Sequence, residues 1–82
     1  MEKYELTVSL KFAAQMTRSG KRGSARGAIQ HVLDAEVVPG THAKALTDIL
    51  VTLDTDSLEP KQGTDLAVQI NEIADDVGGP AG

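Results

Sequence analysis

Hydrophobic and polar residues alternate without interruption near the N-terminal end of the chain. From Tyr4 to Phe12 the even-numbered residues are apolar and the odd-numbered residues are polar. A period of two places all the apolar side chains on one face of a β-strand, and valine, threonine, tyrosine and phenylalanine favour strands. The pattern therefore predicts a half-buried β-strand over residues 4–12.

The segment after this strand predicts a short helical stretch, a turn and then a longer helix. Residues 13–18 have room for two helical turns, and the glycines that follow favour a turn. Ser24 is a suitable N-cap for a helix over residues 25–38, where apolar residues recur at helical spacing. Pro39 and Gly40 end this helix.

The second half of the chain predicts two more helices, separated by a loop. Thr41 can cap a helix that ends near Leu53, although the β-branched residues within 49–53 leave a strand there as the alternative. Thr64 can cap a last helix over residues 65–77, whose apolar residues share one face.

Together these elements predict an α+β fold in a single small domain over residues 1–77, with a flexible tail at 78–82. Residues 1–38 form a strand plus a helix with a basic start, and residues 41–77 form an acidic helical half. A lone strand leaves its backbone hydrogen-bonding groups unpaired, so it must pair with residues near 49–53 or with a second copy of the chain. A chain of 82 residues buries a small core, which favours the homodimer.

Composition excludes several classes of function. The chain has no cysteine, which excludes a disulfide scaffold, thiol catalysis and a cysteine metal site. Its two histidines, His31 and His42, have no ligand partner at metal-binding spacing. The apolar runs are too short to span a bilayer. We therefore expect a cytoplasmic protein that is not an enzyme and holds no metal or cofactor.

The net charge of −4 conceals an uneven distribution along the chain. Residues 1–40 carry six basic and four acidic side chains, a balance of +2, whereas residues 41–82 carry two basic and eight acidic ones, a balance of −6. Such a split predicts two surfaces with different partners.

Basic residues gather where the helix over 25–38 is expected to begin. Lys21, Arg22 and Arg26 lie just before and over that start. Cations at a helix N-terminus oppose the helix dipole, so stability does not explain them. Free backbone N–H groups flanked by cations can bind an anion, either a nucleic-acid phosphate or a carboxylate-rich protein surface. A solvated basic loop is the plain alternative.

The stretch from Ser19 to Glu36, Ser-Gly-Lys-Arg-Gly-Ser-Ala-Arg-Gly-Ala-Ile-Gln-His-Val-Leu-Asp-Ala-Glu, resembles the signature of ParD/CopG-type ribbon–helix–helix antitoxins. The alternating segment upstream is similar to the ribbon of that family, and the match covers residues 4–36. The resemblance implies a homodimer whose two strands pair antiparallel and enter the major groove of operator DNA. A C-terminal segment would then bind and neutralise a toxin.

The resemblance also implies roles for individual residues. The outward strand residues would face the DNA bases: Thr7, Ser9 and Lys11. The start of the second helix would hold phosphate through the backbone of Ser24 and Ala25, aided by three cations: Lys21, Arg22 and Arg26.

Two functional hypotheses follow. In the first, the chain is a dimeric DNA-binding regulator of antitoxin type whose acidic half binds a partner protein. The acidic residues expected to contact that partner are Asp48, Asp54, Asp56, Glu59 and Asp65. The alternative is a small non-enzymatic inhibitor or adaptor, of the type found in phages and plasmids, that acts by protein–protein binding alone.

Overall fold

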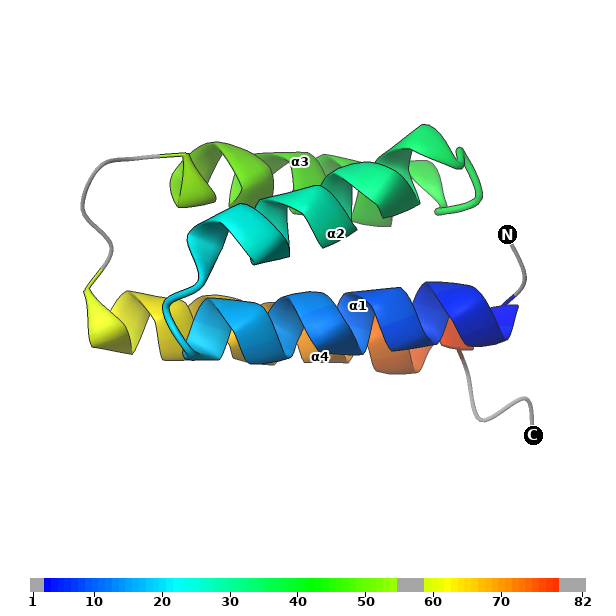
Figure 1. Cartoon of the computed structure of the whole chain (residues 1–82). Coiled ribbons are helices and arrows are strands. Elements are labelled where there is room, and N and C mark those ends of the chain that lie inside the picture. The colour runs from blue at the N-terminus through cyan, green and yellow to red at the C-terminus, as the bar shows by residue number, and fades with distance from the viewer. Residues whose placement is uncertain (1–2, 55–58, 79–82) are drawn as a thin grey trace.

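The computed structural model describes residues 3–54 and 59–78 and shows four helices in two layers (Figure 1). Helices α1 and α4 form one layer, and α2 and α3 form the other. Consecutive helices run in opposite directions, so that the start of α1 and the end of α4 lie at the same end of the molecule. The helices span Lys3–Arg18 (α1), Arg22–Asp34 (α2), Gly40–Leu53 (α3) and Pro60–Gly78 (α4).

The predicted α+β fold and its N-terminal strand are wrong, because residues 4–12 lie inside α1. Residues two apart point to nearly opposite sides of a helix, whereas residues four apart share a side. The alternating apolar residues therefore divide into two sets. Leu6 and Leu10 are buried, while Tyr4, Val8 and Phe12 are exposed.

The buried face of α1 continues beyond the alternating segment, which explains why a helix forms there. Ala13, Ala14 and Thr17 extend the line of Leu6 and Leu10 into the core. The Thr17 hydroxyl is satisfied because it donates a hydrogen bond to the Ala13 carbonyl at 2.7 Å. One continuous helix thus buries five residues along one face and pairs its backbone internally, which a lone strand could not do.

This helix also removes the original argument for a homodimer. The backbone of residues 4–12 bonds within α1, so no second strand is required to pair it. A ribbon shared between two chains, the basis of the ribbon–helix–helix prediction, is therefore wrong. Self-association itself stays a prediction.

A tight corner joins α1 to α2. Gly20 has φ of +79°, a conformation that favours glycine, and the Lys21 N–H donates to the Met16 carbonyl at 2.8 Å. Helix α2 begins at Arg22, so Ser24 is not its N-cap; Lys21 holds that position and its side chain makes no capping bond. The helix ends four residues before the predicted limit.

Helices α3 and α4 form where two helices were predicted, but both begin earlier than expected. Pro39, not Thr41, is the N-cap of α3, which begins at Gly40. Helix α3 runs through residues 49–53, where a strand was the alternative. Helix α4 begins at Pro60 rather than after Thr64, because a proline fits the first turn of a helix, where its missing N–H has no partner to lose. The predicted tail at 78–82 is wrong for its first residue, because Gly78 is the last residue of α4, and residues 79–82 lie outside the described part of the chain.

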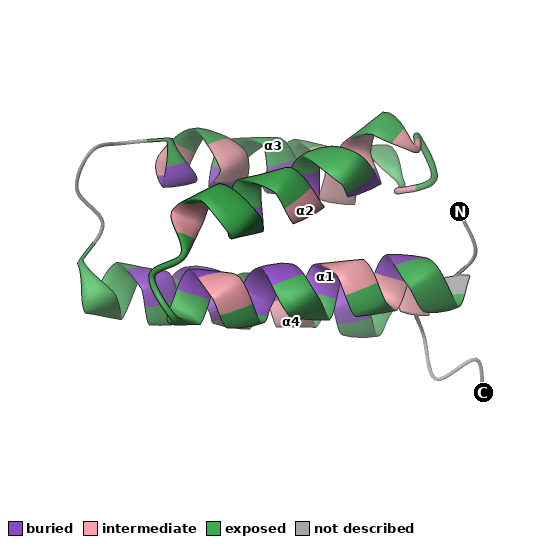
Figure 2. Ribbon diagram, in the orientation of Figure 1, coloured by how far each residue is buried: buried purple, intermediate pink, exposed green. Residues whose placement is uncertain are grey.

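The core lies between the two layers, with buried residues from all four helices facing inward (Figure 2). Helix α1 packs most extensively against α4 and next against α2. Helices α1 and α4 both bury alanines, whose small side chains allow the two helices to pack closely. Lys11 pairs with Asp75 at 3.4 Å, and His42 pairs with Asp76, so ion pairs link α4 to α1 and to α3.

Over residues 3–54 and 59–78, no helix is long and apolar enough to cross a membrane.

Replacing Gly27 with alanine should raise the free energy of unfolding by about 0.5–1 kcal/mol. Gly27 lies inside α2, is exposed, and has nothing within 4 Å of the place where a Cβ would be added. Alanine therefore lowers the entropy of the unfolded chain without a clash. Urea denaturation followed by circular dichroism measures the change, and a loss of stability would contradict the helical assignment of this position.

Candidate functional site

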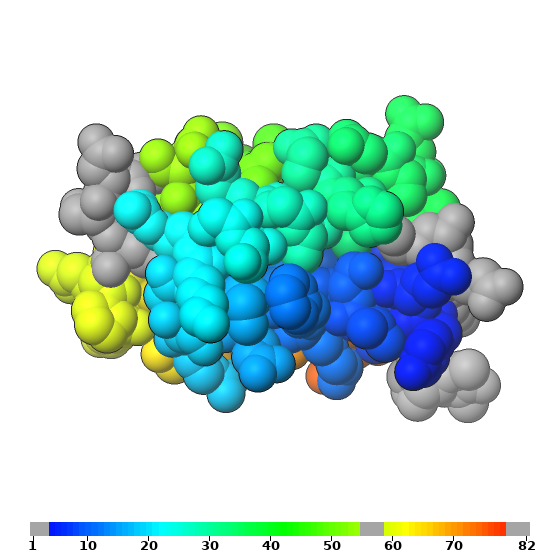
Figure 3. Space-filling model, in the orientation of Figure 1, coloured from blue at the N-terminus to red at the C-terminus, as the bar shows by residue number. Residues whose placement is uncertain are grey.

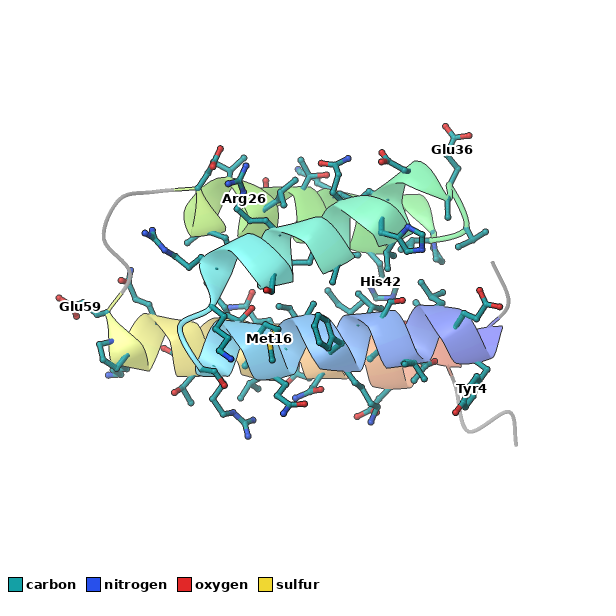
Figure 4. All side chains as sticks on the ribbon, viewed as in Figure 1. Tyr4, Met16, Arg26, Glu36, His42 and Glu59 are labelled. Carbon is teal, nitrogen blue, oxygen red and sulfur yellow. The ribbon has the colours of Figure 1, made fainter. Side chains whose placement is uncertain are left out.

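Three exposed apolar residues form a line along α1, which we call the α1 stripe: Tyr4, Val8 and Phe12. Their exposed fractions are 76%, 48% and 46%. They are spaced four residues apart, so they follow one side of the helix away from the buried face. Tyr4 extends from the outer end of α1, away from the α2–α3 layer (Figure 4). The stripe contains both aromatic residues of the chain.

The fold does not require large apolar side chains at these positions. Valine and phenylalanine favour a helix less than alanine does, so their exposure brings α1 no stability. The other large exposed apolar residues of the described chain are scattered over different segments: Val37, Val51 and Val68. Exposed aromatic residues gathered on a rigid element are typical of a protein-binding surface.

The residues predicted to read DNA bases do not all share a face. Ser9 lies two residues from both Thr7 and Lys11 and therefore points to nearly the opposite side of α1. Thr7 and Lys11 are four residues apart and both face α4, because Lys11 pairs with Asp75 and a Cβ added at Gly78 would collide with the Thr7 hydroxyl oxygen. The ribbon that would have aligned these residues is absent from the described chain.

The predicted phosphate-binding residues occupy the first turns of α2. Ser24 and Lys21 are exposed there, and Arg22 is half-buried. Ala25 is fully buried and its N–H donates to the Lys21 carbonyl at 3.1 Å. That N–H is therefore engaged within the helix, and the implied contact of Ala25 with phosphate loses its donor.

The acidic residues predicted to bind a partner spread around the junction of α3 and α4. Asp48 is exposed on α3, Asp54 follows its last residue, and Glu59 and Asp65 are exposed at the start of α4. Asp56 lies outside the described residues. The role of these carboxylates as a partner-binding surface stays a prediction.

The basic and acidic groups predicted from separate halves of the sequence meet in the fold. Arg26 of α2 forms a salt bridge with Asp54 at 3.1 Å. This bridge spans a groove between α2 and α3 with a volume of about 530 Å³. The antiparallel arrangement of the helices, rather than the order of the sequence, thus decides which charges are neighbours.

Groups suited to metal binding do not cluster in the described part of the chain. Residues 3–54 and 59–78 contain no group of three or more histidine and acidic side chains placed to hold a metal ion. His42, half-buried at the start of α3, is engaged by Asp76, and His31 is exposed on α2. The two histidines therefore lie on different helices.

Sequence reasoning missed the α1 stripe because it assigned Tyr4, Val8 and Phe12 to the core of a sheet. The spacing of four residues was the signal that could have revealed it. Comparison of the chain with models of protein families, with curated proteins and with solved structures found no match to any of them.

Proposed function

We propose that this chain is a small, non-enzymatic binding protein, an inhibitor or adaptor, that docks on a partner protein through the α1 stripe. The observation that carries the proposal is the exposure of Tyr4, Val8 and Phe12 along one side of α1. Aromatic side chains dominate the energy of many protein interfaces because they bury a large area at little cost in conformational entropy.

The geometry of the stripe defines the partner surface that it fits. With a rise of 1.5 Å per residue, the eight-residue separation of Tyr4 and Phe12 corresponds to about 12 Å along the helix. An apolar groove of that length, with pockets for two rings and a valine, complements the stripe. This is the helix-in-groove mode of recognition, in which side chains at helical spacing act as anchors.

An antitoxin-type regulator that reads DNA through a ribbon needs an N-terminal strand, and α1 stands in its place in the described residues. The binding-protein alternative requires no strand and no second copy of the chain. It also gives a reason for the apolar surface of α1, which helix stability and core packing leave unexplained.

The test compares Phe12→Ser with a control variant, Val68→Ser, which removes a similarly exposed apolar side chain from α4. Each tagged protein is incubated with nuclease-treated lysate of the source cells, and captured proteins are quantified by mass spectrometry. We expect the wild type and the Val68→Ser control to capture the same partner protein in a stoichiometric complex. The Kd of the complex between that partner and Phe12→Ser should be at least tenfold higher than the wild-type value, because truncating an aromatic anchor costs more than about 1 kcal/mol.

Thermal melts of the two variants verify that both remain folded. Equal affinity of the partner for Phe12→Ser and the wild type would contradict the proposal. Capture that disappears on nuclease treatment would instead indicate that nucleic acid is the binding partner.

A further inference from the structure

The side chains of the α1 stripe are arranged symmetrically about Val8. Tyr4 precedes Val8 by four residues and Phe12 follows it by four, so each ring lies about 6 Å from Val8 along the helix. Helix α1 lies open on the face of the molecule that Figure 3 shows. By the order and spacing of its apolar groups, the stripe reads as ring, valine, ring in both directions, so an apolar groove of matching length could receive it either way round.

The Tyr4 hydroxyl distinguishes the two ends of the stripe, because Phe12 has the same ring without that group. The fold does not use this hydroxyl. Tyr4 is 76% exposed and extends away from the α2–α3 layer (Figure 4), and within residues 3–54 and 59–78 its side chain makes no hydrogen bond. The hydroxyl is therefore available to a partner protein.

The charged residues beside the stripe are less suited to distinguish its ends. Lys11 already pairs with Asp75 of α4 at 3.4 Å. Glu5 is exposed next to Tyr4, but successive residues of a helix point about 100° apart, so its carboxylate lies to one side of the line of the stripe. Glu5 is consequently the group against which the Tyr4 hydroxyl has to be tested.

A partner that covers Tyr4 removes its hydroxyl from water, which costs free energy unless an acceptor replaces the lost water. An acceptor oxygen at one end of the partner's groove meets this need in one direction of docking only. In the reverse direction the hydroxyl enters the pocket meant for Phe12, and the acceptor faces a ring that has no donor. Two buried polar groups are then unpaired, which disfavours the reversed complex.

We propose that the Tyr4 hydroxyl fixes the direction in which α1 docks, and that the partner's groove carries an acceptor oxygen at the end that receives Tyr4. The other end of the groove is an apolar pocket without an acceptor, and it receives Phe12. This inference rests on the proposed function, because it concerns the same stripe and the same partner. It adds a rule of specificity, since a groove of equal length without the acceptor binds more weakly.

The first measurement is the Kd of Tyr4→Phe for the partner that the wild type captures. It should be at least about fivefold above the wild-type value, because the partner's buried acceptor loses its donor. Phe12→Tyr should also raise the Kd, because it places a hydroxyl in a pocket without an acceptor. The matched control is Glu5→Gln, which removes the neighbouring charge and should bind as the wild type does.

The second measurement reads the direction of docking. The chain has no cysteine, so Gln15→Cys can carry a single photo-crosslinker at an exposed position three residues beyond Phe12. Peptide mapping of the crosslinked partner should find one labelled region when Tyr4 is present. With Tyr4→Phe it should find two regions, one at each end of the groove, because α1 then docks in both directions. Thermal melts check that every variant is folded.

Three results would overturn this inference while the proposed function stands, provided that Phe12→Ser still weakens binding: an unchanged Kd for Tyr4→Phe, a single labelled region with Tyr4→Phe, or two labelled regions with Glu5→Gln. The last result would assign the direction of docking to the Glu5 carboxylate. Equal binding by Phe12→Ser and the wild type, or the capture of no partner at all, would contradict the proposed function and this inference with it.

Discussion

Replacing Leu10 with alanine is expected to lower the free energy of unfolding by about 2–5 kcal/mol, the range for deletion of a fully buried leucine side chain. Leu10 has no exposed surface and lies in the middle of the buried face of α1. Its truncation removes apolar contacts and leaves a cavity between helices that cannot fully collapse. In so small a domain this loss is a large part of the total stability.

The control for Leu10→Ala is Val8→Ala, two residues away on the same helix. Val8 is exposed, and alanine favours a helix more than valine does, so this variant should be neutral or slightly more stable. Urea denaturation of both variants, followed by circular dichroism, measures the difference. Equal destabilisation by the two changes would mean that both side chains are buried on one face, as in the strand predicted from the sequence.

Enlarging a buried alanine of α4 should have the second-largest effect. Ala67 has no exposed surface and lies on the inward face of α4, the helix that packs most extensively against α1. Replacing it with leucine forces neighbouring side chains or the helices apart and should cost about 1–3 kcal/mol. The adjacent change Val68→Leu introduces the same side chain at an exposed position and should have little effect on the urea midpoint. Similar stability of the two variants would contradict the close packing of α4.

The helices that could be predicted from the sequence are those in which the spacing of the apolar residues fits a helix and not a strand. Ile29 and Val32 in α2, and Ile70 and Ile73 in α4, recur at spacings that suit only a helix, and all four are buried. The alternating segment at residues 4–12 has two interpretations. Its period of two fits a strand, but every second apolar residue is also four positions from the next, which fits one side of a helix. A continued line through Ala13 and Thr17 would have favoured the helix, but alanine and threonine are weak signals of burial.

The candidate surfaces could be predicted less well than the helices. The sequence placed Arg26 in a basic half and Asp54 in an acidic half, yet the antiparallel fold joins them in one salt bridge. The groove lined by residues of α2 and α3 likewise depends on how these two helices pack. Such neighbours are fixed by the packing of distant segments, which local spacing and composition do not encode.

The packing of α1 against α4 has a consequence for folding during synthesis on the ribosome. At about 5–20 residues per second, synthesis of the segment between the end of α1 and the start of α4 takes about 2–8 s. Throughout that time Leu6 and Leu10 lack the helix that covers them most extensively in the finished fold. A ribosome that stalls before α4 would therefore present an open apolar surface to chaperones and proteases.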